Sequence, residues 1–317
     1  MEVVLRKQLK KQIKAKFTLK NKRILSELKA NKVSYAMIAP FMILFFIFTV
    51  LPVISSIVLS FTYFNMLEFP KWVGWLNYRN LFLNDDVFVI AVKNTLIFAF
   101  LTGPISYFAC LIFAWFINEL PPKIRAFMTL VFYAPSISGN LYFIWTFIFS
   151  GDSWGLVNST LMKLGILHEP IQWLTDPAAN MAVLIIVQLW LSLGTGFLAF
   201  IAGFQNIDKS LYEAGAIDGV SNRFQELIYI TLPSMSEQLL FGAVMQISIS
   251  FAVSDVSRYL CGFPSTNYSA HTVVLHIQDY GVVRYEMGYA SAIAVVLFLT
   301  MVLTNKFIRS LLSRYGK

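Results

Sequence analysis

The chain has 317 residues, of which 57% are hydrophobic and only 13% are charged. Soluble domains carry about 25% charged residues, so this composition, with a mean hydropathy of +0.65, excludes an ordinary soluble protein. The net charge of +8 does not indicate nucleic-acid binding, because the basic residues gather at the two ends and no central basic patch is interleaved with aromatic residues.

Residues 1–34 form a basic N-terminal segment, for which two interpretations stay open. It lies on anionic lipid headgroups as an interfacial helix, or its charge only fixes orientation. The apolar run that follows is too long for a secretory signal and has no small-residue cleavage site, so we expect it to remain as a membrane anchor.

Six apolar windows are long enough to cross a bilayer, which takes about 20 residues. They cover 35–61, 88–116, 126–149, 181–203, 237–258 and 288–308. We therefore expect an all-α integral membrane protein with six transmembrane helices. Its parts are a first helix at 35–61, an outer loop at 62–87, a core of five helices at 88–310 and a tail at 311–317.

Orientation follows from Lys and Arg, which are enriched in cytoplasmic loops. The N-terminal segment holds 11 of the 25 Lys and Arg residues, and others flank the second and third windows and close the chain. The loops at 62–87, 150–180 and 259–287 hold only Lys71, Arg79, Lys163 and Arg284, with Arg258 at the end of the fifth window. The bias places both termini in the cytoplasm and these three loops outside.

The sequence predicts local departures from a simple pattern of spans and loops in two segments. The third window contains Pro135 followed by small polar residues, which predicts a kink or local unwinding near the middle of the membrane. The outer loop 150–180 has a short amphipathic stretch between Gly and Pro breaks, which predicts a small helix.

Sites of catalysis and metal binding are not indicated. The chain has no phosphate-binding loop, no nucleophile elbow and no HExxH sequence. Its three His residues lack zinc-ligand spacing. Cys110 lies in the second window and Cys261 in an outer loop, so a disulfide between them is not expected.

The cytoplasmic loop 204–236 contains an acidic insert, LYEAGAIDGVSNRFQELIYITLP, which begins at Leu211. Ser210 and Glu213 stand at capping-box spacing and predict a helix start. Asp218 and Gly219 offer a turn, and a second short helix is expected over 221–229. Two interpretations remain: a slim acidic helix pair that fits a groove on a partner protein, or an ordinary connecting loop.

The insert resembles the EAA motif of bacterial ABC importer permeases. The likeness rests on Tyr212, Glu213, Ala214 and Gly215, on Asp218 and Gly219, and on the closing Ile230, Thr231, Leu232 and Pro233. Two departures are Gly215 in place of the second Ala and one extra residue before Ile230. Further likeness to the carbohydrate, maltose-type branch is carried by Asn94, Thr95, Pro135, Trp145, Gly155, Asn158, Leu161, Gly165 and residues 288–292.

The resemblance implies a type I ABC importer permease in the bacterial plasma membrane. Such a chain pairs with a second homologous permease, docks two nucleotide-binding ATPase subunits and receives a carbohydrate from an extracellular sugar-binding protein. ATP and Mg would be bound by the ATPase subunits, with no cofactor in this chain. Glu213 and Asp218 would meet basic groups on the ATPase, and Gly219 would supply the turn.

Polar and aromatic side chains inside the predicted spans are candidates for a sugar pathway, since intramembrane polar groups usually face a cavity or a neighbouring helix. Sugars are bound by amide and hydroxyl groups beside aromatic rings. The candidates are Asn94, Asn140, Trp145, Gln188, Gln246, Ser250, Phe251 and Ser254. Close helix packing is the competing interpretation for the small residues, and a helix–helix hydrogen bond for Asn94.

Two other classes of protein were compared with the importer. A secondary transporter driven by an ion gradient predicts carboxylates near the membrane midplane, and the predicted spans carry none there. A membrane enzyme predicts a nucleophile with a base or a metal cluster, and the sequence has neither. The importer permease is the favoured hypothesis.

Overall fold

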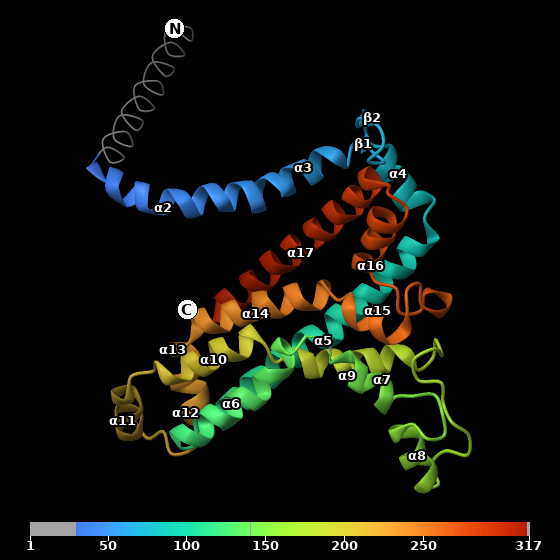
Figure 1. Ribbon diagram of the computed structural model, residues 1–317. Coiled ribbons are helices and arrows are strands. Elements are labelled where there is room, and N and C mark those ends of the chain that lie inside the picture. Colours follow the sequence, from blue (N-terminus) through green and yellow to red (C-terminus); the bar gives the residue numbers. More distant parts are fainter. Residues whose placement is uncertain (1–29, 140, 316–317) are drawn as a thin grey trace, which may run out of the picture. The chain divides into compact units, whose positions relative to one another are not determined.

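The computed structural model describes residues 30–139 and 141–315. The chain divides into two units, Met1–Val58 and Leu59–Lys317. The described residues are mostly helical, as expected (Figure 1).

The described part of the first unit is helical, and its last helix ends at Leu59, the first residue of the second unit. It consists of α2 (Lys32–Phe45), a π-helical turn η1 (Phe46–Val50) and α3 (Leu51–Leu59). No charged residue occurs after Lys32 in this run, and its 28 residues suffice to cross a bilayer. The π-turn ends at Val50, two residues before Pro52, whose missing N–H removes one bond of the regular ladder.

The second unit contains long apolar helices joined by shorter ones. The long helices are α5 (Asp86–Asn118), α6 (Pro122–Ile137), α9 (Asn180–Leu191), α10 (Thr195–Gln205), α14 (Ser236–Phe251) and α17 (Met287–Tyr315). The shorter elements are β1 (Thr62–Tyr63), β2 (Lys71–Trp72), α4 (Leu76–Leu83), α7 (Tyr142–Ile148), α8 (Leu156–Lys163), α11 (Lys209–Ile217), α12 (Arg223–Glu226), η2 (Leu227–Thr231), α13 (Leu232–Ser234), α15 (Asp255–Cys261), η3 (Thr266–Tyr268), α16 (Val273–Gln278) and η4 (Asp279–Val283).

The number of spans depends on how the third one is counted. Within the described residues, five helical stretches are long and apolar enough to cross a membrane, and a sixth is present if α6 and α7 form one bent span. The two helices meet at 88°. The sequence predicted irregularity after Pro135, and the structure has a full break there, at which Gly139 adopts a φ of +59°.

Two further spans are less regular than the sequence predicted. The window 181–203 is divided between α9 and α10 by a non-helical step ending at Gly194. The window 237–258 is divided between α14 and α15. Ser and Gly lower helix propensity; the first break, at 192–194, contains one of each, and the second, at 252–254, contains Ser254.

The core at one end of the second unit is formed where α5, α10 and α14 pack on one another. Phe197 and Phe200 are fully buried there. Gly242 of α14 lies against Phe200, and a Cβ atom at this glycine would come within 2.4 Å of the phenylalanine ring. A small residue therefore sets the close approach of α14 to α10, as is usual between membrane helices.

The segments predicted as outer loops contain local structure. Residues 62–87 include the antiparallel pair β1–β2, in which Thr62 faces Trp72, followed by α4. Residues 150–180 contain α8, as predicted. Asn158 of α8 is fully buried and organises this loop by donating to the carbonyl oxygens of Ser150, Asp152 and Ile171 at 3.0–3.2 Å.

Candidate functional site

The acidic insert forms a helix, a sharp turn and a return. Helix α11 begins at Lys209, two residues earlier than the capping box at Ser210 and Glu213 predicts. Its N-cap is Asp208, whose carboxylate accepts a hydrogen bond from the Ser210 backbone N–H at 3.0 Å. The capping-box prediction is therefore wrong, because an Asp two residues upstream is an equally strong N-cap.

Helix α11 ends in a Schellman motif. Gly219 has a φ of +92°, its N–H donates to the Ala216 carbonyl at 3.3 Å, and the Val220 N–H donates to the Gly215 carbonyl at 2.9 Å. This pattern needs a residue in the left-handed conformation after the helix, which glycine adopts without a steric penalty. The predicted turn at Asp218 and Gly219 is present.

The return begins with a second cap. The Asn222 side chain accepts from the Gln225 N–H at 2.8 Å, and α12 starts at Arg223. The predicted helix over 221–229 is thus shorter as an α-helix and continues as the π-turn η2. The extra residue noted in the sequence falls within this return.

Three contacts hold the helices of the insert in place, two within the insert and one to α5. Within the insert, the Tyr212 hydroxyl lies 2.9 Å from the Thr231 hydroxyl. The Arg223 guanidinium lies 3.5 Å from the Glu119 carboxylate at the C-cap of α5. Gly215 is buried, and a Cβ atom there would lie 2.4 Å from the end of the Ile230 side chain. A displacement of α11 would therefore be transmitted to η2, and one of α12 to α5.

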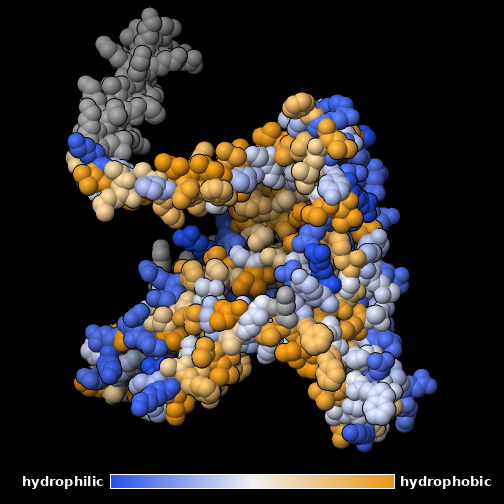
Figure 2. Space-filling view, viewed as in Figure 1, coloured by the Kyte–Doolittle hydropathy of each residue, from blue (hydrophilic) through white to orange (hydrophobic). Residues whose placement is uncertain are grey.

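The outer surface of the insert is exposed. Glu213 and Asp218 are exposed, Leu211 is 45% exposed, and Ile217 is 87% exposed. Hydrophilic residues gather over α11 and α12 (Figure 2). Ile217, Phe224 and Tyr229 are exposed apolar residues of the insert. A charged rim around an apolar contact is a surface suited to docking a protein.

A pocket of about 580 Å³ lies between the insert and the ends of α5 and α6. Its lining includes Glu213, Tyr212, Arg223, Glu119 and Arg125. The sequence did not predict this pocket, because it depends on the end of α5 lying beside the insert.

Three of the predicted pathway residues lie beside one cavity. Gln246, Ser250 and Phe251 of α14 line a space of about 310 Å³ shared with α5 and α17. The Gln246 amide also donates to the Ser192 carbonyl at 3.1 Å, so it bonds to the break between α9 and α10. This residue both borders a cavity and joins two spans.

The other predicted pathway residues lie elsewhere. The Asn94 amide is buried and donates to the carbonyls of Tyr268 and His271 at 3.1 and 2.9 Å. Trp145 packs among aromatic rings, with its ring centre 5.3 Å from that of Trp190. Gln188 is buried in α9, Ser254 lies next to Asp255 between α14 and α15, and Asn140 is outside the described residues.

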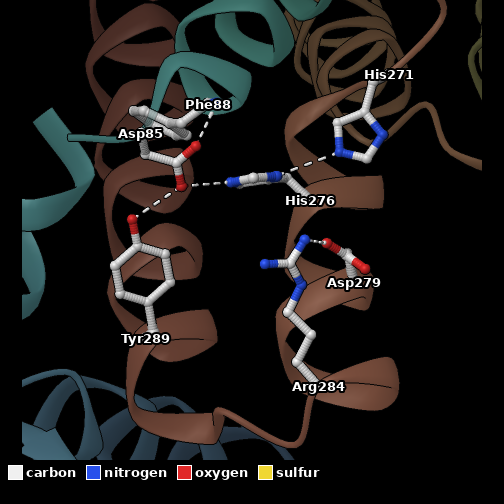
Figure 3. Close-up of polar contacts among 7 residues, drawn as sticks. All are labelled: Asp85, Phe88, His271, His276, Asp279, Arg284 and Tyr289. Carbon is white, nitrogen blue, oxygen red and sulfur yellow. Dashed lines mark hydrogen bonds and ion pairs between the residues drawn. The ribbon is translucent and has the colours of Figure 1, made fainter. Parts of the chain in front are cut away.

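A buried polar network at the start of α5 was not predicted (Figure 3). The Asp85 carboxylate accepts from the Phe88 N–H at 2.8 Å and from the Tyr289 hydroxyl at 2.9 Å, and it lies 2.9 Å from His276 Nε2. His276 Nδ1 lies 3.2 Å from His271 Nε2. The network joins α5, α16 and α17.

The network has strong effects on its titrating groups. Burial alone would raise the pKa of Asp85, but the hydrogen bonds from His276, Phe88 and Tyr289 outweigh it and lower that pKa to about 2. Burial, aided by the charge of His276, lowers the pKa of His271 to about 4. Among the described residues no group of His, Cys, Asp and Glu is placed to hold a metal ion.

Comparison with known proteins gives consistent matches. A family model described as binding-protein-dependent transport system inner membrane component matches residues 88–317. The chain is 33% identical over 278 residues to the probable ABC transporter permease protein YesP of Bacillus subtilis, covering 86% of this chain and 87% of that one. It is 33% identical over 288 residues to the lactose transport system permease protein LacF of Rhizobium radiobacter, covering 88% and 93%.

The fold also matches a solved structure. A crystal structure of a bacterial ABC transporter that imports the acidic polysaccharide alginate contains a chain that aligns with a TM-score of 0.71 and 24% identity. The alignment covers 93% of this chain and all of that one. At this identity the match shows the fold, which is that of a type I importer permease.

Proposed function

The chain belongs to the family of binding-protein-dependent transport system inner membrane components, and we propose that it is the permease subunit of an ATP-driven importer for an oligosaccharide. It would pair with a second homologous permease, two ATPase subunits and an extracellular sugar-binding protein in a bacterial plasma membrane. Both termini would be cytoplasmic. The lactose permease relative supports a carbohydrate as the cargo.

The geometry of the insert is the observation that carries this proposal. A short capped helix with a fixed left-handed end presents Glu213, Asp218 and Ile217 outward. Behind it, Tyr212 connects α11 to η2 within the insert, and Arg223 connects α12 to the end of α5. A connecting loop needs neither an exposed apolar residue at its tip nor contacts that transmit force.

Coupling would proceed from this surface inward. Closure of the ATPase subunits on ATP would move α11, with Glu213 and Asp218 paired to basic groups on the ATPase. The movement would pass from α11 to η2 through Tyr212 and Thr231, and from α12 to α5 through the Arg223–Glu119 pair. Helix α5 packs on α10 and α14 and shares the cavity beside Gln246 with α14 and α17.

This chain would bind neither ATP nor Mg, since the phosphate-binding sequences are absent from it. An ion-gradient-driven transporter is less well supported, because none of the described spans carries a carboxylate near its middle. The pathway residues Asn94, Asn140, Trp145, Gln188, Gln246, Ser250, Phe251 and Ser254 remain proposals for sugar contact.

Co-purification tests the proposal. The tagged chain is extracted gently from its native membrane, and the accompanying proteins are identified by mass spectrometry. Recovery of a homologous permease and an ATPase subunit is expected. If the chain purifies without any ATPase, the insert is better interpreted as an ordinary connecting loop, and the gradient-driven transporter is favoured.

A further inference from the structure

A second pocket lies at the opposite end of α5 from the insert. It has a volume of about 610 Å³ and is lined by residues of β1, α4, η4 and the start of α17. Helix α5 has 33 residues and is therefore about 50 Å long. With the insert in the cytoplasm, this pocket is on the outer side of the membrane.

The pocket is lined by aromatic rings. Tyr280 and Tyr289 stand with their ring centres 4.4 Å apart. Tyr63, on β1, is 48% exposed at the same pocket. The Arg284 guanidinium lies 4.4 Å from the centre of the Tyr280 ring, so one face of that ring is covered while Tyr63 and Tyr289 remain as apolar surfaces for a ligand.

Amide and carboxylate groups surround these rings. Asn80 and Asn84 of α4 line the pocket and share one hydrogen bond of 3.3 Å, which leaves most of their donor and acceptor capacity for another group. Glu286 is exposed at the pocket. Aromatic faces beside amides and a carboxylate match the alternating C–H faces and hydroxyl groups of a sugar.

The polar groups are held in place before any ligand binds. Asp85, in the pocket lining, is fixed by its bonds to Phe88, His276 and Tyr289 (Figure 3). Arg284 is fixed by the Asp279 carboxylate at 2.7 Å. Fixed groups reduce the entropy that ordering the site on binding would cost.

The charge of the lining decides between neutral and acidic sugars. It holds two carboxylates, Asp85 and Glu286, against the single guanidinium of Arg284. Arg284 is already paired with Asp279. Asp85 is already bonded to Phe88, His276 and Tyr289, so Glu286 is the carboxylate left to meet a ligand. It would repel an anionic sugar and accept from a hydroxyl group of a neutral one.

We infer that this pocket is a binding site for a neutral glycosyl group on the outer side of the permease, separate from the cavity within the membrane. The inference rests on the proposed function. The volume lies within the range of about 300–1,000 Å³ that small-ligand pockets show. The glycosyl group could belong to a free oligosaccharide or to a glycolipid headgroup, which present the same chemistry.

The test uses the complete transporter in lipid nanodiscs without glycolipid, binding protein or nucleotide. Saturation-transfer NMR measures binding of lactose, raffinose and the acidic control digalacturonate. Glu286→Ala removes an acceptor, and Asn84→Trp narrows the pocket. The matched control is Glu169→Ala, which alters an exposed glutamate in the other outer loop.

Lactose or raffinose should bind to the wild type. Glu286→Ala should weaken binding by roughly tenfold, the value of one hydrogen bond to a charged group, and Asn84→Trp should abolish binding because the indole ring occupies the pocket. Glu169→Ala should bind as the wild type does, and digalacturonate should bind more weakly than the neutral sugars. A second result would also support the inference: free sugars do not bind, a glucosyl lipid added to the nanodiscs does, and Asn84→Trp abolishes binding of this lipid. The pocket would then bind the glycosyl group of a glycolipid.

Equal sugar binding by the wild type and both pocket variants would overturn the inference. It would also be overturned if Asn84→Trp lost a protein partner while its glycosyl binding stayed unchanged. Sugar uptake by cells carrying the wild-type chain separates the two hypotheses. Uptake without binding at this pocket refutes only the pocket, whereas absence of any carbohydrate uptake refutes the proposed function.

Discussion

Asp85→Asn tests whether the buried network stabilises the junction of α5, α16 and α17. The three hydrogen bonds to this carboxylate lower its pKa from 3.8 to about 2. Each pKa unit corresponds to about 1.4 kcal/mol, so the ionised form contributes about 2 kcal/mol above pH 4, which is lost as the pH falls through 2. An asparagine has no charge. Because His276 and Tyr289 both bond to one oxygen of Asp85 and the Phe88 N–H to the other, a single amide oxygen cannot accept all three bonds.

The assay is thermal unfolding of the purified transporter at pH 7.5, at one scan rate. For a chain of this size 2 kcal/mol corresponds to a fall in Tm of roughly 4 °C. The control is Asp86→Asn, which neutralises the exposed neighbouring acid in the first turn of the same helix and should have a smaller effect. If the two variants melt at the same temperature, the network does not stabilise the junction.

Three further predictions concern separate parts of the structure. The pKa of His271 is about 4 in the folded chain and 6.5 ordinarily, so between pH 6.5 and 4 this residue is protonated only in the unfolded chain. Acidification over this range should lower the free energy of unfolding by ~3 kcal/mol and the Tm with it. His271→Phe should make the Tm less dependent on pH, and an unchanged dependence would contradict the assignment. Asn158→Ala removes the buried side chain that donates to three carbonyls of the 150–180 loop and should destabilise this loop by roughly 3 kcal/mol, seen as much faster proteolysis there; wild-type resistance would refute this role. Gln246→Ala should lower sugar uptake severalfold while the ATPase remains bound, compared with Ser248→Ala on the same helix; equal uptake by the two variants would remove Gln246 from the pathway.

The spans and the insert could be predicted from the sequence because their signals are local. Apolar windows and a capped, glycine-terminated helix are read from neighbouring residues. The sequence did not show which of two nearby residues caps the first helix of the insert. Asp208 and Ser210 are both good N-caps, and only the structure shows that the backbone turns at Asp208.

The polar network could not be predicted because its members are far apart in sequence. His276 and Asp85 are separated by 191 residues, and nothing in the spacing of three histidines indicates that two of them meet. The same limit applies to Asn94, whose amide bonds to carbonyls 174 and 177 residues away. A polar residue in an apolar window indicates a partner without identifying it.

The central claim is that the acidic insert couples ATP hydrolysis to sugar import, and it is tested most directly in proteoliposomes that contain the complete transporter, binding protein and ATP. Glu213→Lys should reduce ATP-driven uptake more than tenfold while the second permease still co-purifies. The charge-matched control Glu169→Lys, in the outer loop, should transport as the wild type does. Wild-type uptake by Glu213→Lys would contradict the account.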